Sequence, residues 1–140
     1  MCAKPTAELA ERLMDAAIRA ADRAYVPYSD FPVGAALLTA EGTIVTGCNI
    51  ENASYPLTNC AERVAIGSAV AGGTRVIQAI AVFAPRVETV TPCGACRQVI
   101  NEFKPAGEEL WMIFHTNDGP ELVPFSEILP RAFGPRDLER

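Results

Sequence analysis

Histidine is nearly missing from this sequence, whose 140 residues include a single one, His115. Lysine and arginine are also few, 12 against 17 aspartates and glutamates, and they form no run. Proteins that bind nucleic acid generally carry a basic face, so a net charge of −5 argues against a polynucleotide partner. The one histidine lies far from the cysteine motifs described below, which excludes a mixed histidine and cysteine metal site there.

Long apolar stretches are absent as well. No run of 18 apolar residues occurs, and residues 1–6 lack the apolar centre of a secretory signal. We therefore expect a cytoplasmic protein without a membrane partner, in a compartment where thiols stay reduced. With 49% hydrophobic and 21% charged residues, the chain has an ordinary globular composition. Residues 1–140 are expected to form one domain.

Three of the five cysteines stand in two short motifs. Cys60 opens Cys-Ala-Glu-Arg, and Cys93 and Cys96 lie in Pro-Cys-Gly-Ala-Cys-Arg-Gln. Together with Glu62 they offer three thiols and one carboxylate. Zinc sites that do chemistry typically use three protein ligands and leave the fourth position to water. This pattern indicates a catalytic zinc site with Glu62 as its proton carrier.

The cysteine spacing has a physical reason. Cys93 and Cys96 are three residues apart and share one face of a helix's first turn, and Cys60 begins a second helix in the same way. Helix N-termini lower the pKa of a thiol because the dipole and free N–H groups favour the thiolate. Three thiolates leave a zinc site negative, a charge that we expect Arg63 and Arg97 to offset.

Two other interpretations compete with a catalytic site. Cys93 and Cys96 alone would fit a thiol redox pair, which leaves Cys60 and Glu62 without a role. A zinc-stabilised binding module would close the fourth position with another ligand, and the motifs offer none.

Hydrophobic periodicity predicts the order of helices and strands. The expected helices are 6–24, 60–71, 93–103 and 126–129, the last capped by Ser126; the expected strands are 33–39, 43–48, 77–84, 110–115 and 121–123. Strand 77–84, helix 93–103 and strand 110–115 form a right-handed βαβ unit, so this helix begins at the carboxyl end of strand 77–84. If strand 43–48 runs the same way, the three thiols meet at one edge of the sheet. The two other cysteines are expected to be a disordered terminus, Cys2, and a buried small side chain, Cys48.

Six segments of the chain follow a pattern known from one family: 24–29, 31–37, 47–53, 60–63, 92–98 and 129–134. Over nearly its whole length the sequence resembles the small homotetrameric, zinc-dependent cytidine deaminases of pyrimidine salvage. The resemblance implies an α/β fold of three α-β-α layers with a mixed five-stranded sheet, and one Zn²⁺ per chain. It also implies deamination of cytidine and deoxycytidine to uridine and deoxyuridine. A relative that acts on a nucleoside antibiotic shares much of the motif, so a related nucleoside analogue stays open as the substrate.

The resemblance also assigns roles at the metal. It makes Cys60, Cys93 and Cys96 the zinc ligands and Glu62 the residue that shuttles the proton. Arg63 tempers the negative charge of the thiolates.

The nucleoside contacts follow from the resemblance as well. The resemblance implies that Asn49 and Glu51 bind the ribose hydroxyls. They are alternate residues, so their side chains can face the same way. The residues implied to bind or support the nucleoside, some of them from a neighbouring subunit, are Phe31, Asn49, Glu51, Ala61, Phe133 and Tyr55. Without the resemblance, Phe31 and Phe133 would be read as ordinary packing residues.

Overall fold

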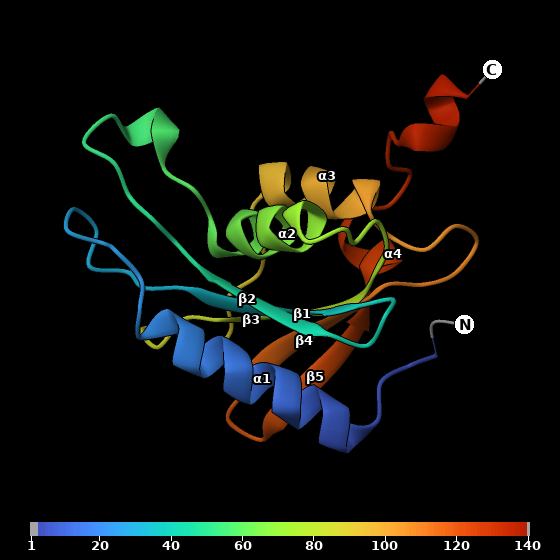
Figure 1. Ribbon diagram of the computed structural model, residues 1–140. Helices are drawn as coiled ribbons and strands as arrows, with labels where there is room; N and C mark the ends of the chain where they lie inside the picture. Colours follow the sequence, from blue (N-terminus) through green and yellow to red (C-terminus); the bar gives the residue numbers. More distant parts are fainter. Residues whose placement is uncertain (1–2, 140) are drawn as a thin grey trace.

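The computed structural model, which describes residues 3–139, has one sheet between two layers of helices (Figure 1). In chain order its elements are α1 (Ala7–Ala21), β1 (Gly34–Thr39), β2 (Ile44–Cys48), η1 (Tyr55–Leu57), α2 (Ala61–Ala71), β3 (Ile77–Phe83), α3 (Gly94–Glu102), β4 (Trp111–Thr116), β5 (Gly119–Pro124), α4 (Phe125–Ile128) and η2 (Pro135–Leu138). The predicted helices and strands are therefore confirmed, with ends that move by a few residues. Cys2 lies outside the described residues.

The sheet is mixed and has the strand order β2-β1-β3-β4-β5. β3 pairs with β4 in parallel through α3, which confirms the predicted βαβ unit. β1 is antiparallel to both β2 and β3, so β2 and β3 run in the same direction. The carboxyl ends of β2 and β3 therefore lie at the same edge, as the meeting of the three thiols requires.

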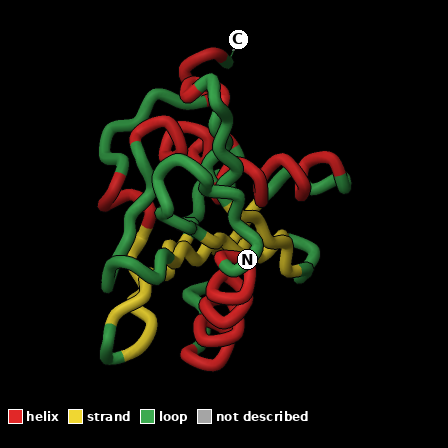
Figure 2. The backbone as a smooth tube through the Cα atoms, turned by 90° about the vertical axis from the view of Figure 1, so that its left-hand side faces the viewer, coloured by secondary structure: helices red, strands yellow, loops and turns green. Residues whose placement is uncertain are grey.

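Each face of the sheet carries its own core. On one face, Ala36, Ala79 and Ala81 are fully buried against α1. On the other, Leu37 and Ile80 are fully buried with residues of α2 and α3. Figure 2 shows α1 alone on one side of the sheet and the remaining α-helices on the other. Burial on both faces explains why the β3 sequence is almost wholly apolar.

Helix α2 crosses β2 at Gly47, and no larger residue fits there. An added Cβ on this glycine would lie 2.5 Å from the backbone nitrogen of Ala65 and 2.6 Å from the carbonyl oxygen of Ala61. The first turn of α2 is therefore held directly against the sheet. Because Cys60 and Glu62 belong to that turn, Gly47 fixes their height above the sheet.

Two local predictions are wrong. Helix α4 begins at Phe125, with Pro124 rather than Ser126 at its N-cap, because Phe125 is 1% exposed and its burial sets the start of the turn. Ser126 instead binds Glu109, its hydroxyl donating to the carboxylate over 2.6 Å. Cys48 is half-buried, since β2 is an edge strand of the sheet.

Among residues 3–139, no helix combines the length and the apolar character needed to cross a bilayer.

Candidate active site and metal centre

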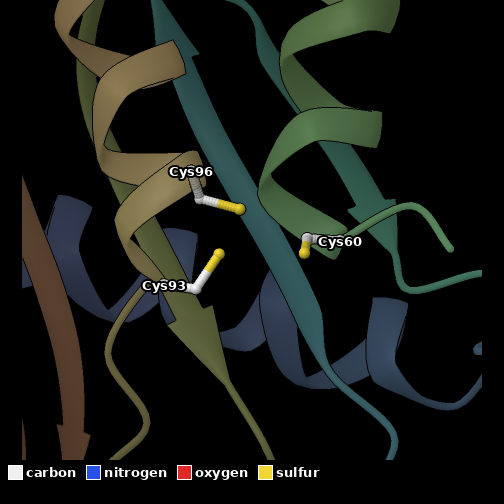
Figure 3. Close-up of side chains that lie close together, drawn as sticks. All are labelled: Cys60, Cys93 and Cys96. Carbon is white, nitrogen blue, oxygen red and sulfur yellow. The ribbon is translucent and has the colours of Figure 1, made fainter. Parts of the chain in front are cut away.

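Three thiols converge where α2 and α3 begin. Cys60 is the N-cap of α2, Cys93 is the N-cap of α3, and Cys96 lies buried in the first turn of α3. Their sulfur atoms all lie within 4.8 Å of one another, and the side chains point toward a common centre (Figure 3). Sulfurs around a tetrahedral zinc ion with bonds of about 2.3 Å stand roughly 4 Å apart. The donor atoms and their spacing therefore fit one zinc ion.

The pKa values of Cys93 and Cys96 are shifted in opposite directions. Burial acts to raise the pKa of Cys93, but the backbone N–H groups of Cys96 and Ala95, with the neighbouring thiols, outweigh it and lower that pKa. For Cys96, burial raises the pKa, and the nearby charge of Glu62 raises it further. The helix terminus thus acts on Cys93 as the sequence predicted, whereas the deeper thiol needs a cation to ionise.

Glu62 stands in the first turn of α2 and is 4% exposed. Burial raises the pKa of its carboxyl, while the backbone N–H of the same residue and the charge of Arg63 act in the opposite direction. A carboxyl whose pKa is moved toward neutrality both accepts and returns a proton under ordinary conditions. The charge of Glu62 acts on the pKa of Cys96, which places this proton carrier near the thiol cluster.

The two arginines expected to offset the thiolate charge behave differently. Arg63 donates to the Cys60 sulfur over 3.2 Å, and this hydrogen bond is the main reason that the pKa of Arg63 is raised. Arg97 donates to the carbonyl oxygens of Pro92 and Ile128, over 2.8 and 2.7 Å. Its guanidinium fixes the loop before α3 to the end of α4, and the expectation that it offsets the thiolates is corrected.

Asn49 is joined to the backbone of the segment that carries Phe31. Its side-chain amide donates to the carbonyl oxygen of Phe31 and accepts from the N–H of Val33, both over 2.9 Å. Asn49 therefore holds Phe31, which is half-buried, in place relative to the end of β2.

Glu51 is joined to the residues just before Phe31. Its carboxylate accepts the backbone N–H groups of Tyr28 and Ser29, over 2.9 and 3.1 Å, and the Ser29 hydroxyl. The hydroxyl, followed by the two N–H groups, lowers the pKa of Glu51 against the opposing effect of desolvation. A hollow of about 240 Å³ lies beside this carboxylate, lined by Tyr28, Ser29, Glu51, Tyr55 and Thr58. No role for Ser29 was predicted from the sequence, in which its place in the 24–29 segment was the only signal.

Within residues 3–139, neither Tyr55 nor Phe133 makes a hydrogen bond or ring contact with the thiol cluster. Tyr55 is 69% exposed and stacks on Tyr28, with ring centroids 5.7 Å apart. Phe133 is 59% exposed, and its carbonyl oxygen accepts from Gln98 on the outer side of α3. Ala61, in contrast, is fully buried beside Cys60.

Comparisons with known proteins agree with this site. A family model described as the cytidine and deoxycytidylate deaminase zinc-binding region matches residues 7–108, a span that includes all three thiols and Glu62. The cytidine deaminase of Sporosarcina psychrophila is 48% identical over 91% of this chain and 93% of its own length. The cytidine deaminase of Halalkalibacterium halodurans is 49% identical over 91% and 96%.

Solved structures give the same result for the fold. A crystal structure of cytidine deaminase from Burkholderia pseudomallei matches with a TM-score of 0.79 and 44% identity, covering 87% of this chain and 97% of that one. The cytidine deaminase of Mycobacterium tuberculosis matches with a TM-score of 0.75 and 39% identity, over 89% and 96%. The predicted mixed α/β fold and the zinc cofactor are confirmed by these matches together with the thiol cluster.

Proposed function

Because this chain belongs to the cytidine and deoxycytidylate deaminase family, we propose that it is a cytidine deaminase of pyrimidine salvage. It hydrolyses cytidine and deoxycytidine to uridine and deoxyuridine and releases ammonia. The observation that carries this proposal is the meeting of three thiols and one buried carboxyl at the starts of two helices. A redox pair would need only Cys93 and Cys96 and would leave the other two groups unused.

The metal ligands of this proposal are Cys60, Cys93 and Cys96. Zinc held by three protein ligands supplies a Lewis acid that makes water a nucleophile near neutral pH. The hydrogen bond from Arg63 to Cys60 supports the assignment of Arg63 as the residue that tempers the negative charge of the thiolates.

Glu62 carries the protons. It takes one from the attacking water and gives it to ring atom N3 as the water oxygen bonds to C4. It then moves the second proton of that water to the amino group, which leaves as ammonia while the C4 carbonyl forms. A buried carboxyl with a raised pKa supports this double role, because it holds a proton between the two transfers.

The nucleoside contacts are proposed from the loops around the thiols. Asn49 and Glu51 hold the ribose hydroxyls, Phe31 packs on the base, and the first turn of α2 at Ala61 lines the pocket floor. The turn 28–33, to which Asn49 and Glu51 are hydrogen-bonded, brings these groups together and supports the assignment.

A neighbouring subunit completes the pocket. We assign Tyr55 and Phe133 to the site of an adjacent chain in a homotetramer with shared active sites. The large exposure of both rings supports this assignment. The enzyme of this proposal works in the cytoplasm on free nucleosides, with neither nucleic acid nor membrane as partner.

One experiment tests the activity directly. Purified protein of measured zinc content is incubated with cytidine, and the ultraviolet absorbance is followed. The expected result is loss of the cytidine band and release of ammonia in step with zinc content, with a Glu62→Gln variant as the inactive control. Zinc-loaded protein that leaves cytidine and deoxycytidine unchanged would overturn the proposal.

A further inference from the structure

The Ser29 hydroxyl joins two residues of the proposed nucleoside pocket. It donates its proton to the Glu51 carboxylate and accepts the backbone N–H of Phe31 over 3.1 Å. The backbone N–H of Ser29 also donates to Glu51, over 3.1 Å. One side chain thus links the carboxylate proposed to hold the sugar to the ring proposed to hold the base.

The hydroxyl has one proton, and this contact uses it. The proton is given to Oε2 of Glu51, while Oε1 receives the N–H groups of Tyr28 and Ser29. Both carboxylate oxygens are therefore held from the same side, by the same turn. The lone pairs that stay free are directed away from that turn, which leaves them to accept hydrogen bonds from a ligand.

The same turn is held at its other end by Asn49, through Phe31 and Val33. The segment 28–33 is consequently fastened to both residues proposed as ribose ligands. Ser29 is the only point in this network where a side chain of the turn, rather than its backbone, makes the connection to Glu51. Its hydroxyl can therefore be removed by substitution while both backbone N–H groups that donate to Glu51 remain. The hydrogen bond from the Phe31 N–H to this hydroxyl is lost with it.

We propose that Ser29 is a positioning residue that sets the selectivity of the site for the sugar. Its hydroxyl orients the Glu51 carboxylate toward a ribose hydroxyl and holds the Phe31 backbone at a fixed position relative to that carboxylate. This inference rests on the proposed function. It assigns Ser29 no contact with the reacting atoms. Its loss should therefore weaken binding of a nucleoside that carries ribose hydroxyls and leave the chemical step largely unchanged.

The test compares Ser29→Ala with the wild type on two substrates, cytidine and 2′,3′-dideoxycytidine. Loss of a hydrogen bond to a charged group is expected to raise KM for cytidine about tenfold, with kcat changed by less than about twofold. KM for the dideoxy substrate should rise much less, because this substrate lacks the hydroxyls that Glu51 would hold and depends on Ser29 only through Phe31. The preference for cytidine should therefore fall about tenfold.

Three further variants separate positioning from general damage. Ser29→Thr keeps the hydroxyl and is expected to restore the preference. Ser126→Ala removes an equivalent hydroxyl-to-carboxylate bond, to Glu109 near α4, and should leave both KM values unchanged. In the double variant of Ser29→Ala with Glu51→Gln, the loss should not exceed that of Glu51→Gln alone, since Ser29 acts through Glu51.

The inference is overturned if Ser29→Ala leaves the cytidine KM unchanged, or if KM rises equally for both substrates. Additive losses in the double variant would also overturn it. Failure of the proposed function looks different, because the wild type itself would then not deaminate cytidine.

Discussion

The thiol cluster is built from helix termini, whereas most of the residues proposed to bind the nucleoside lie in loops. Cys96 and Glu62 are 0% and 4% exposed and stand in first turns that pack on the sheet. Tyr55 and Phe133, by contrast, are more than half exposed. The difference teaches that one chain can fix the three thiols and Glu62 by itself, while the side chains proposed to contact the nucleoside stay open to further contacts.

Removal of a metal ligand should have the largest effect, because it destroys the buried part of the site, which consists of the three thiols and Glu62. Cys96→Ala is expected to lose zinc, activity and thermal stability together, since metal binding is coupled to folding. Metal analysis and a melting curve on the same sample check this. Cys48→Ala is the matched control and should keep all three. A Cys96→Ala protein with full zinc and an unchanged melting temperature would remove Cys96 from the ligand set.

Glu62→Gln should separate chemistry from structure within the buried part of the site. Turnover is expected to fall by about 10²–10⁴ or more, because a proton carrier is lost while every ligand remains. Zinc content should stay at the wild-type level. Turnover near that of the wild type would contradict the assignment of Glu62.

The same variant carries a stability prediction. Burial raises the pKa of Glu62, so the folded state holds this proton more tightly than the unfolded chain. The resulting stabilisation is present below the unfolded pKa and is lost as pH rises. Glu62→Gln should therefore melt at the same or a higher temperature than the wild type near neutral pH, and its advantage should grow as pH rises above the unfolded pKa of about 4. Melting curves across this range measure the difference.

Phe133→Ala tests the exposed part of the proposed site, which includes Tyr55 and Phe133. If this ring completes a neighbour's pocket, KM for cytidine should rise roughly ten- to a hundredfold, as expected for loss of about 1.5–3 kcal/mol of burial. Zinc content and the melting temperature of each chain should hold. Leu138→Ala, which removes another exposed apolar side chain of the tail, is the control.

Truncation after residue 130 extends that test to assembly. It should raise KM at least as much as Phe133→Ala and weaken the oligomer in sedimentation. A truncated tetramer with unchanged KM would make the tail an ordinary surface segment.

The smallest expected effect comes from packing beneath the metal. Gly47→Ala forces α2 away from β2 and should destabilise the protein by about 1–3 kcal/mol. Gly67→Ala lies within α2, where the added carbon meets no atom within 4 Å beyond its chain neighbours and the backbone of its own helix, and should instead stabilise by about 0.5–1 kcal/mol. Denaturant curves on both variants measure the contrast. Equal effects of the two substitutions would show that the α2 contact does not fix the site.

The sequence predicted the buried part of the site better than the exposed part. Cysteine spacing and strand direction together located the thiols, because helix starts and sheet edges follow from local pattern. The partners of Arg97, Ser29 and Asn49 could not be found in this way. Their hydrogen bonds depend on how loops distant in sequence meet, and the hydrophobic periodicity of the sequence carries no information about these contacts.

The division of the thiols between two helix N-caps also bears on how the chain folds. Cys60 and Cys93 stand about thirty residues apart, with the whole of α2 and β3 between them. An ion bound to both cysteines closes this stretch into a loop. A link of that span lowers the conformational entropy of the unfolded chain by an amount equivalent to a free energy on the order of 3–4 kcal/mol. The three sulfurs meet only after β3 has delivered α3 to the edge where α2 begins. The complete set of metal ligands is therefore a property of the assembled sheet and does not exist within any single helix or strand.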